Sequence, residues 1–134
     1  MSDFAREPEK ARDFLKAGAD ANPWSFEIPS SLGKLYFDNF KQYRLAAAAL
    51  AKSVELVKKE KVYLSKHGEK FDEQQKQTLG ETYLYLARSY AKLHEYDKGL
   101  ATCDAGLKEV PTYNLLRVEK RIINKHMAER SGQG

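Results

Sequence analysis

The spacing of apolar positions predicts helices over most of the chain. Between residues 42 and 65, apolar side chains such as Leu50 and Val57 recur every three or four positions, which is the period of one helix face. Similar stripes run from about residue 71 to Leu93 and from Tyr96 to Val110. The four prolines lie outside the two longest stripes, and no segment alternates with the two-residue period of a strand. The sequence therefore predicts an all-α protein.

Two further helices complete the predicted core. One is expected from Ser30 to about Asp38 or Phe40, with a serine N-cap and a turn at Asp38-Asn39, and the other from Thr112 to about Glu129. Pro111 is expected to end the helix before it, because a proline disfavours helical backbone in the preceding residue. Asp72 is the predicted N-cap of the helix that starts near residue 72. About five helices are therefore expected in a single domain spanning residues 30–130.

The first 29 residues are predicted to form an irregular N-terminal arm. A short helix is expected from Glu7 to Ala17, after which Pro23 and Pro29 favour extended or turn backbone. Three bulky apolar residues are expected to anchor this arm on the core, or alternatively on a partner: Trp24, Phe26 and Ile28. At the other end, residues 131–134 are expected to be a disordered tail.

Composition and charge indicate an intracellular protein. Of its 134 residues, 42% are hydrophobic and 31% charged, and the net charge is +4, below what a dedicated nucleic-acid-binding protein carries. The single cysteine, Cys103, cannot form an internal disulfide, and the N-terminus is typical of neither a signal peptide nor a mitochondrial presequence. A cytoplasmic location is expected. The longest apolar run has seven residues, so insertion into a membrane is not expected.

Residues 83–111 carry the spacing of a known helical repeat. Large and small side chains alternate there at Tyr83, Leu86, Ala87, Tyr90, Tyr96, Gly99, Cys103, Gly106 and Pro111. This segment resembles one complete tetratricopeptide repeat, and residues 30–56 resemble a second, degenerate copy. The resemblance implies a short solenoid of helical hairpins. Because glycine is costly inside a helix, Gly99 and Gly106 are predicted to lie with Ala87 where two helices approach most closely.

The sequence contains no recognisable arrangement of catalytic or metal-binding residues. It lacks a nucleophile paired with a base, a phosphate-binding glycine loop and the spacing of metal ligands. The three histidines lie in separate predicted elements, and Cys103 falls at a core position. A protein that is not an enzyme is therefore expected, without a cofactor, a metal or a small-molecule substrate.

The tetratricopeptide resemblance implies a module that binds protein segments. In that family the concave face, formed by the first helix of each pair, is the binding surface. Here it would carry Tyr85, Arg88 and Lys92, with Lys34 on the preceding pair. Arg88 and Lys92 are one helical turn apart, so together they could hold a carboxylate of an acidic segment. The alternative, that both side chains only keep the helix soluble, carries equal weight.

A second function stays open, that of a small structural subunit in a larger multi-protein or ribonucleoprotein assembly. Its arm and its basic last helix would hold it there. Four cations recur along that helix at steps of one to four residues and could contact an acidic partner or RNA: Arg117, Lys120, Arg121 and Lys125. RNA is the less favoured partner, because mixed-charge helix faces are usually only solvated. The last helix departs from the repeat pattern and is interpreted as a polar cap of the solenoid.

Overall fold

The computed structural model describes residues 7–133, most of which are helical. The elements follow in the order α1 (Glu7–Ala21), α2 (Glu27–Leu35), η1 (Tyr36–Phe40), α3 (Tyr43–Lys66), α4 (Glu73–Lys92), α5 (Tyr96–Glu109) and α6 (Asn114–Gln133). The η1 element is a short π-helix that continues α2 through Asp38 and Asn39, so the turn expected at these two residues is wrong. No strand occurs within residues 7–133, so the prediction of an all-α fold is confirmed, with six α-helices in this part of the chain.

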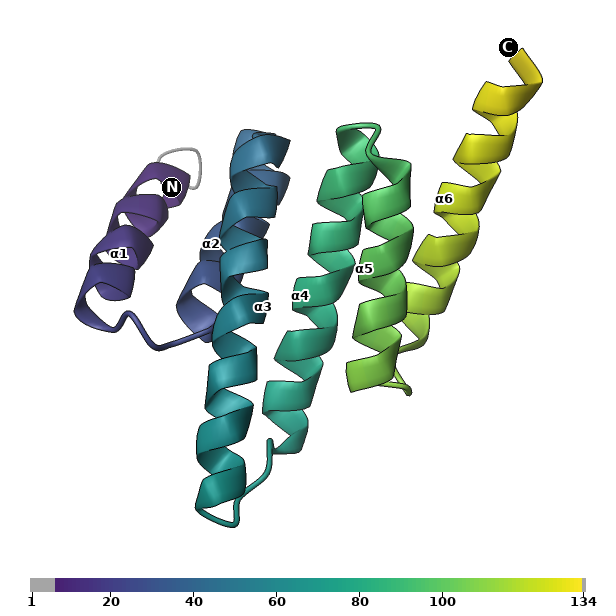
Figure 1. The fold of residues 1–134 in the computed structure, drawn as a ribbon. Coiled ribbons are helices and arrows are strands. Elements are labelled where there is room, and N and C mark those ends of the chain that lie inside the picture. Colours follow the sequence, from purple (N-terminus) through teal and green to yellow (C-terminus); the bar gives the residue numbers. More distant parts are fainter. Residues whose placement is uncertain (1–6, 134) are drawn as a thin grey trace.

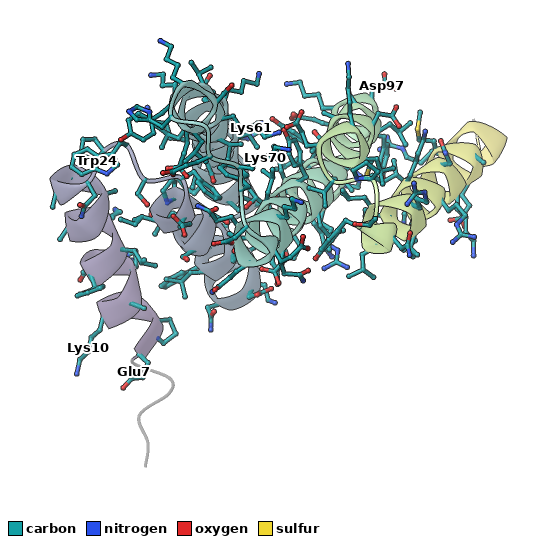
Figure 2. All side chains as sticks on the ribbon, turned by 90° about the horizontal axis from the view of Figure 1, so that it is seen from below. Glu7, Lys10, Trp24, Lys61, Lys70 and Asp97 are labelled. Atoms are coloured by element: carbon teal, nitrogen blue, oxygen red, sulfur yellow. The ribbon has the colours of Figure 1, made fainter. Side chains whose placement is uncertain are left out.

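Successive helices run in alternating directions across the molecule (Figure 1). α2 with η1 packs against α3, α4 packs against both α3 and α5, and α6 packs against α5 and α4. Seen along the helices, α3 and α5 lie on one side, whereas α2 and α4 lie on the other (Figure 2). Since α4 contacts both α2 and α6, these three helices form a continuous face.

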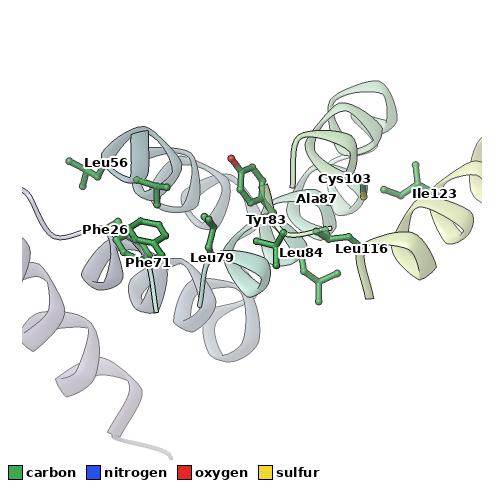
Figure 3. Close-up of a cluster of buried hydrophobic side chains, with 12 residues drawn as sticks. Phe26, Leu56, Phe71, Leu79, Tyr83, Leu84, Ala87, Cys103, Leu116 and Ile123 are labelled. Carbon is green, nitrogen blue, oxygen red and sulfur yellow. The ribbon is translucent and has the colours of Figure 1, made fainter. Parts of the chain in front are cut away.

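Two clusters of buried apolar side chains hold the helices together. The larger one extends from the start of α2 to α6 (Figure 3). Its fully buried members are Phe26, Val57, Leu79, Ala87, Cys103, Leu116 and Ile123. The smaller cluster joins η1, α3 and α4 through Tyr36, Ala46, Ala47, Leu50 and Leu86. Each large apolar side chain that is fully buried stabilises the fold by about 1.5–3 kcal/mol, so the long helices α3 and α4 are held mainly by this packing.

The small side chains within segment 83–111 lie where helices approach one another closely, as predicted. Ala87 is fully buried. A Cβ atom added at Gly99 would lie 3.3 Å from the Ala87 carbonyl oxygen and 3.0 Å from Ile123 Cδ1. At Gly106 it would lie 2.7 Å from both Tyr83 Cβ and Leu116 Cδ1. The prediction for these three positions is therefore confirmed. Both glycines also leave room for side chains of α6, namely Ile123 beside Gly99 and Leu116 beside Gly106.

The N-terminal segment is helical, which corrects the prediction of an irregular arm. α1 extends to Ala21 instead of Ala17, and α2 begins at Glu27, three residues before Ser30. Pro29 is the third residue of α2, a position in the first turn where a helix needs no backbone donor. The helix can therefore include a proline that the sequence pattern assigned to extended backbone.

Phe26 is the residue that anchors this segment. Its side chain is fully buried, and its ring stacks on Phe71 with 5.6 Å between centroids. Its carbonyl oxygen accepts a hydrogen bond from Ser53 Oγ at 2.6 Å. Ile28 is partly buried, whereas Trp24 remains 66% exposed. The expectation of three anchoring residues on the core is therefore wrong for Trp24.

The start of α4 confirms a prediction, whereas the end of α6 corrects one. Asp72 caps α4, since its side chain accepts from the Gln75 backbone N–H at 2.7 Å and Gln75 Oε1 accepts from the Asp72 N–H at 2.9 Å. At the C-terminus, α6 continues to Gln133, so the expected disordered tail is helical as far as that residue. Ala128, Glu129 and Arg130 favour helix, and no proline follows them. Gly134 lies outside the described residues.

Candidate functional site

The four predicted binding residues all lie on or beside α4, on the face that it shares with α2. Lys34 comes from α2, and its Nζ forms an ion pair with Glu81 Oε1 of α4 at 2.6 Å. Tyr85, Arg88 and Lys92 follow one another on α4 at steps of three and four residues, so they lie along one side of this helix. The structure thus brings the four residues to one face, although each has an intramolecular contact.

Tyr85 connects α4 to η1. Its hydroxyl donates a hydrogen bond to Asp38 Oδ2 at 2.9 Å, and its ring meets Phe37 edge-on with 5.4 Å between centroids. Burial, followed by the hydrogen bond to Asp38, raises the pKa of Tyr85 to about 12. Tyr85 therefore remains a neutral donor at physiological pH. Together with the Lys34–Glu81 ion pair, it holds α2 and η1 against α4.

Arg88 already has a carboxylate partner within the protein. Its Nε lies 3.2 Å from Glu119 Oε1 of α6, and the side chain of Glu119 is only 8% exposed. A charge that is so deeply buried requires a partner, and Arg88, which is 39% exposed, supplies it. The carboxylate that Arg88 was expected to bind in a partner is thus supplied by α6, and the ion pair connects α4 to that helix.

Lys92 is the most accessible of the four. Its side chain is exposed, and its Nζ lies 5.7 Å from the centre of the Tyr43 ring, which is a cation–π distance. Among the described residues, no carboxylate forms an ion pair with Lys92. Its charge is therefore available to a ligand.

A surface hollow of about 650 Å³ lies between η1, α4 and α6. Phe37 lines it from η1, Arg88 and Lys92 from α4, and Ile122 and His126 from α6. We call this the α4–α6 hollow. Of the four predicted binding residues, only Arg88 and Lys92 line this hollow, whereas Lys34 and Tyr85 do not. The lining residues from η1 and α6 were not predicted. The four-residue step from Ile122 to His126 shows that both lie on one side of α6, but only the fold shows that this side faces α4.

Comparison with known proteins does not assign the chain to a family. No protein-family model matches it, and neither a curated protein nor a solved structure matches it. The tetratricopeptide resemblance therefore rests on the spacing within residues 83–111 and stays a prediction. The use of the α4–α6 hollow has to be inferred from its own geometry.

The predicted cationic stripe of α6 divides into two pairs of residues. Arg117 Nη1 donates to the Pro111 carbonyl oxygen at 2.8 Å and to Asn114 Oδ1 at 2.9 Å. Lys120 Nζ forms an ion pair with Asp104 Oδ1 of α5 at 2.7 Å. Arg117 is thus bound to the first residue of its own helix and to Pro111 in the connection before it, and Lys120 connects α6 to α5. Arg121 and Lys125 are exposed and form no ion pair with a described residue.

The exposed side of α6 is less polar than predicted. Three large apolar side chains at steps of three and four residues remain exposed there: Leu115, Val118 and Ile122. These positions lie along one side of the helix, away from the fully buried Leu116 and Ile123. α6 is therefore not a purely polar cap, because an apolar stripe runs beside Arg121 and Lys125.

The remaining reactive and metal-binding side chains form no site in the described part of the chain. Burial, followed by the charges of Glu119 and Asp104, raises the pKa of the Cys103 thiol to about 12, so Cys103 is a poor nucleophile at neutral pH. Within residues 7–133, no three His, Cys, Asp or Glu side chains gather as they would around a metal ion. None of the helices described there combines the length and apolar character needed to cross a membrane.

Proposed function

We propose that the protein is an adaptor of the tetratricopeptide type, which binds a protein segment in the α4–α6 hollow and catalyses no reaction. The observation that supports this most is the composition of the hollow. It combines a cation without an ion-pair partner among the described residues, Lys92, with two apolar side chains, Phe37 and Ile122. A concave surface with a few polar groups among apolar ones is typical of a binding site.

The side chains of the hollow suit a segment that carries both a carboxylate and an apolar residue. Lys92 would pair with the carboxylate, while Phe37 and Ile122 would cover the apolar side chain. Arg88 uses Nε for Glu119, but a guanidinium has five N–H donors, so its outer nitrogens can also donate to the ligand. Glu119 would keep Arg88 oriented toward the hollow. An acidic segment is therefore the favoured ligand class.

Lys92 offers a cleaner test than Arg88. Removing Arg88 would leave the buried carboxylate of Glu119 unpaired, which destabilises a protein, so any loss of binding would be ambiguous. Lys92→Glu changes an exposed side chain on the wall of the hollow. Lys108→Glu is the matched control, because Lys108 is an exposed lysine on α5 and does not line the hollow.

Affinity capture followed by mass spectrometry compares these variants. Because a charge-assisted hydrogen bond contributes about 1.5–3 kcal/mol, Lys92→Glu should reduce recovery of the bound protein by about tenfold or more. Lys108→Glu should leave recovery unchanged. Equal recovery with both variants would refute binding in the hollow.

The exposed stripe of α6 favours a second candidate function, that of a structural subunit. Leu115 and Val118, beside Arg121 and Lys125, form a surface that a helix of a larger assembly could cover. Leu115→Ser combined with Val118→Ser should then release the protein from its complex, as measured by gel filtration of the complex. RNA contact through Arg121 and Lys125 predicts instead that binding falls steeply as salt rises.

A further inference from the structure

Trp24 is a large aromatic side chain that the core does not use. It is 66% exposed, although Phe26, two residues later, is fully buried. Trp24 lies within a turn, in which the Ser25 N–H donates to the Asn22 carbonyl oxygen at 3.1 Å. Trp24 is therefore presented to solvent by a turn that directly precedes the anchored residue Phe26. Figure 2 shows it at the connection between α1 and α2, on the opposite side of the molecule from α6.

Trp24 forms one wall of a second surface hollow, of about 610 Å³, which we call the Trp24 pocket. The lining residues are Pro23, Trp24, Leu56, Lys59, Glu60 and Tyr63. Tyr63 is 59% exposed, and its ring stacks on His67 with 4.2 Å between centroids. Leu56 is buried and provides an apolar surface within the pocket. The stacking on His67 therefore orients the Tyr63 wall of the pocket.

The pocket also contains a carboxylate without an internal partner. Glu60 is partly buried, and burial, followed by the negative charge of Glu27, raises its pKa. Neither Glu60 nor Glu27 forms an ion pair or a side-chain hydrogen bond with a described residue. Lys59 is the one cation among the six lining residues, and it lies beyond ion-pair distance of both. A cation in the pocket would thus relieve the repulsion between these carboxylates.

We infer that the Trp24 pocket binds an arginine side chain carried by a segment of a partner protein. A guanidinium is planar, stacks on aromatic rings and is weakly hydrated, so it fits between Trp24 and Tyr63. Its N–H groups can donate to the Glu60 carboxylate in a charge-assisted pair. Pro23 and Leu56 contact the aliphatic part of the arginine. The pocket is formed by α3 and the α1–α2 connection, so this inference does not depend on the use of the α4–α6 hollow.

Fluorescence tests the inference directly, because Trp24 is the only tryptophan of the chain. The probe is the peptide acetyl-Ala-Ala-Arg-Ala-Ala-amide, and the matched probe carries citrulline, which has the shape of arginine without its charge. The arginine peptide should change Trp24 emission saturably, with a Kd on the order of 0.1–1 mM. The citrulline peptide should bind at least about tenfold more weakly, since it loses a charge-assisted pair.

Two substitutions assign this binding to the pocket. Glu60→Gln should weaken the arginine peptide by about tenfold, because it removes the charge but preserves the shape of the side chain. Glu69→Gln is the matched control, since Glu69 is exposed and does not line the pocket. Tyr63→Ala should also weaken binding, while the far-UV circular dichroism stays unchanged.

Three results would overturn the inference. The first is equal binding of the arginine and citrulline peptides. The second is unchanged binding by Glu60→Gln. The third is that the arginine peptide has no effect on Trp24 emission up to about 5 mM. In that case, the emission of Trp24 is measured again with vesicles containing phosphatidylserine. A shift of the emission by these vesicles would assign the exposed aromatic residues to a membrane surface.

Discussion

Glycines occupy some of the closest contacts between helices in this fold. A methyl group at Gly106 would lie 2.7 Å from Tyr83 Cβ and from Leu116 Cδ1, and both of these side chains are buried. Neither can move aside without disturbing the core. Gly106→Ala should therefore lower the free energy of unfolding by about 1–3 kcal/mol, the usual cost of overpacking, as measured by urea denaturation.

Gly18 provides a matched control for this prediction. It also lies inside a helix, but a Cβ atom there would be 3.6 Å from Ile28 Cδ1, which is an ordinary contact. Alanine favours helix over glycine by up to about 1 kcal/mol, so Gly18→Ala should leave stability unchanged or increase it. Two variants with the same stability would contradict the assignment of Gly106 to a close contact.

Cys103 should be protected from thiol reagents in the folded protein. It is fully buried, and its raised pKa of about 12 leaves almost no thiolate at pH 8. Labelling with Ellman's reagent should follow the rate of unfolding and accelerate in urea. Rapid labelling of the folded protein, without urea, would show that the packing of α5 against α4 and α6 is not as described.

At the scale of the elements, the long helices were the easiest to predict. α3, α4 and α5 begin and end close to their predicted limits, because each combines a long apolar stripe with a clear boundary signal, such as the Asp72 cap. α2 was harder, because Pro29 is compatible both with extended backbone and with a first helical turn. Local sequence could not distinguish these states, since the decision depends on the burial of Phe26 against Phe71, 45 positions away.

The candidate site was only partly predictable for a related reason. The position of Arg88 and Lys92 on one side of a helix follows from their spacing. The pairing of Arg88 with Glu119 does not, because it requires α6 to pack against α4 across 31 positions of the chain. The same holds for Tyr85 and Asp38, and for the exposure of Trp24. Contacts between elements that are distant in the sequence therefore determine which of the predicted cations form an internal ion pair and which can bind a ligand.

The two N-terminal helices should differ in what they contribute to stability. α1 has no buried residue, so deleting residues 1–21 should lower the free energy of unfolding by only about 1–2 kcal/mol. Deleting residues 1–29 also removes Phe26, including the carbonyl oxygen that accepts the hydrogen bond from Ser53. This deletion should lower the free energy of unfolding by a further 3–5 kcal/mol, roughly the value for truncating a buried aromatic side chain. Urea denaturation measures both. If removing residues 1–21 lowers the free energy of unfolding more than the further removal of residues 22–29 does, Phe26 is not the anchor.

On the scale of the whole molecule, the two proposed binding surfaces, the α4–α6 hollow and the Trp24 pocket, lie on different helices. The face shared by α2, α4 and α6 contains the α4–α6 hollow, with Lys92 and Ile122. The Trp24 pocket lies on α3 and the α1–α2 connection. The apolar clusters extend from Phe26 and η1 to α6, and the exposed side chains that line the two surfaces, such as Trp24, Tyr63 and Ile122, are not among their buried members. Substitutions of exposed residues on either surface should therefore change binding without unfolding the protein.

Site-specific photo-cross-linking tests the central proposal most directly, because it reports contact instead of loss of function. Benzoylphenylalanine would replace Ile122, which is exposed in the α4–α6 hollow, or Ala101, which is exposed on α5. A bound protein segment in the hollow predicts a cross-linked partner from position 122 and none from position 101. Cross-linking from position 101 alone, or equally from both, would contradict it.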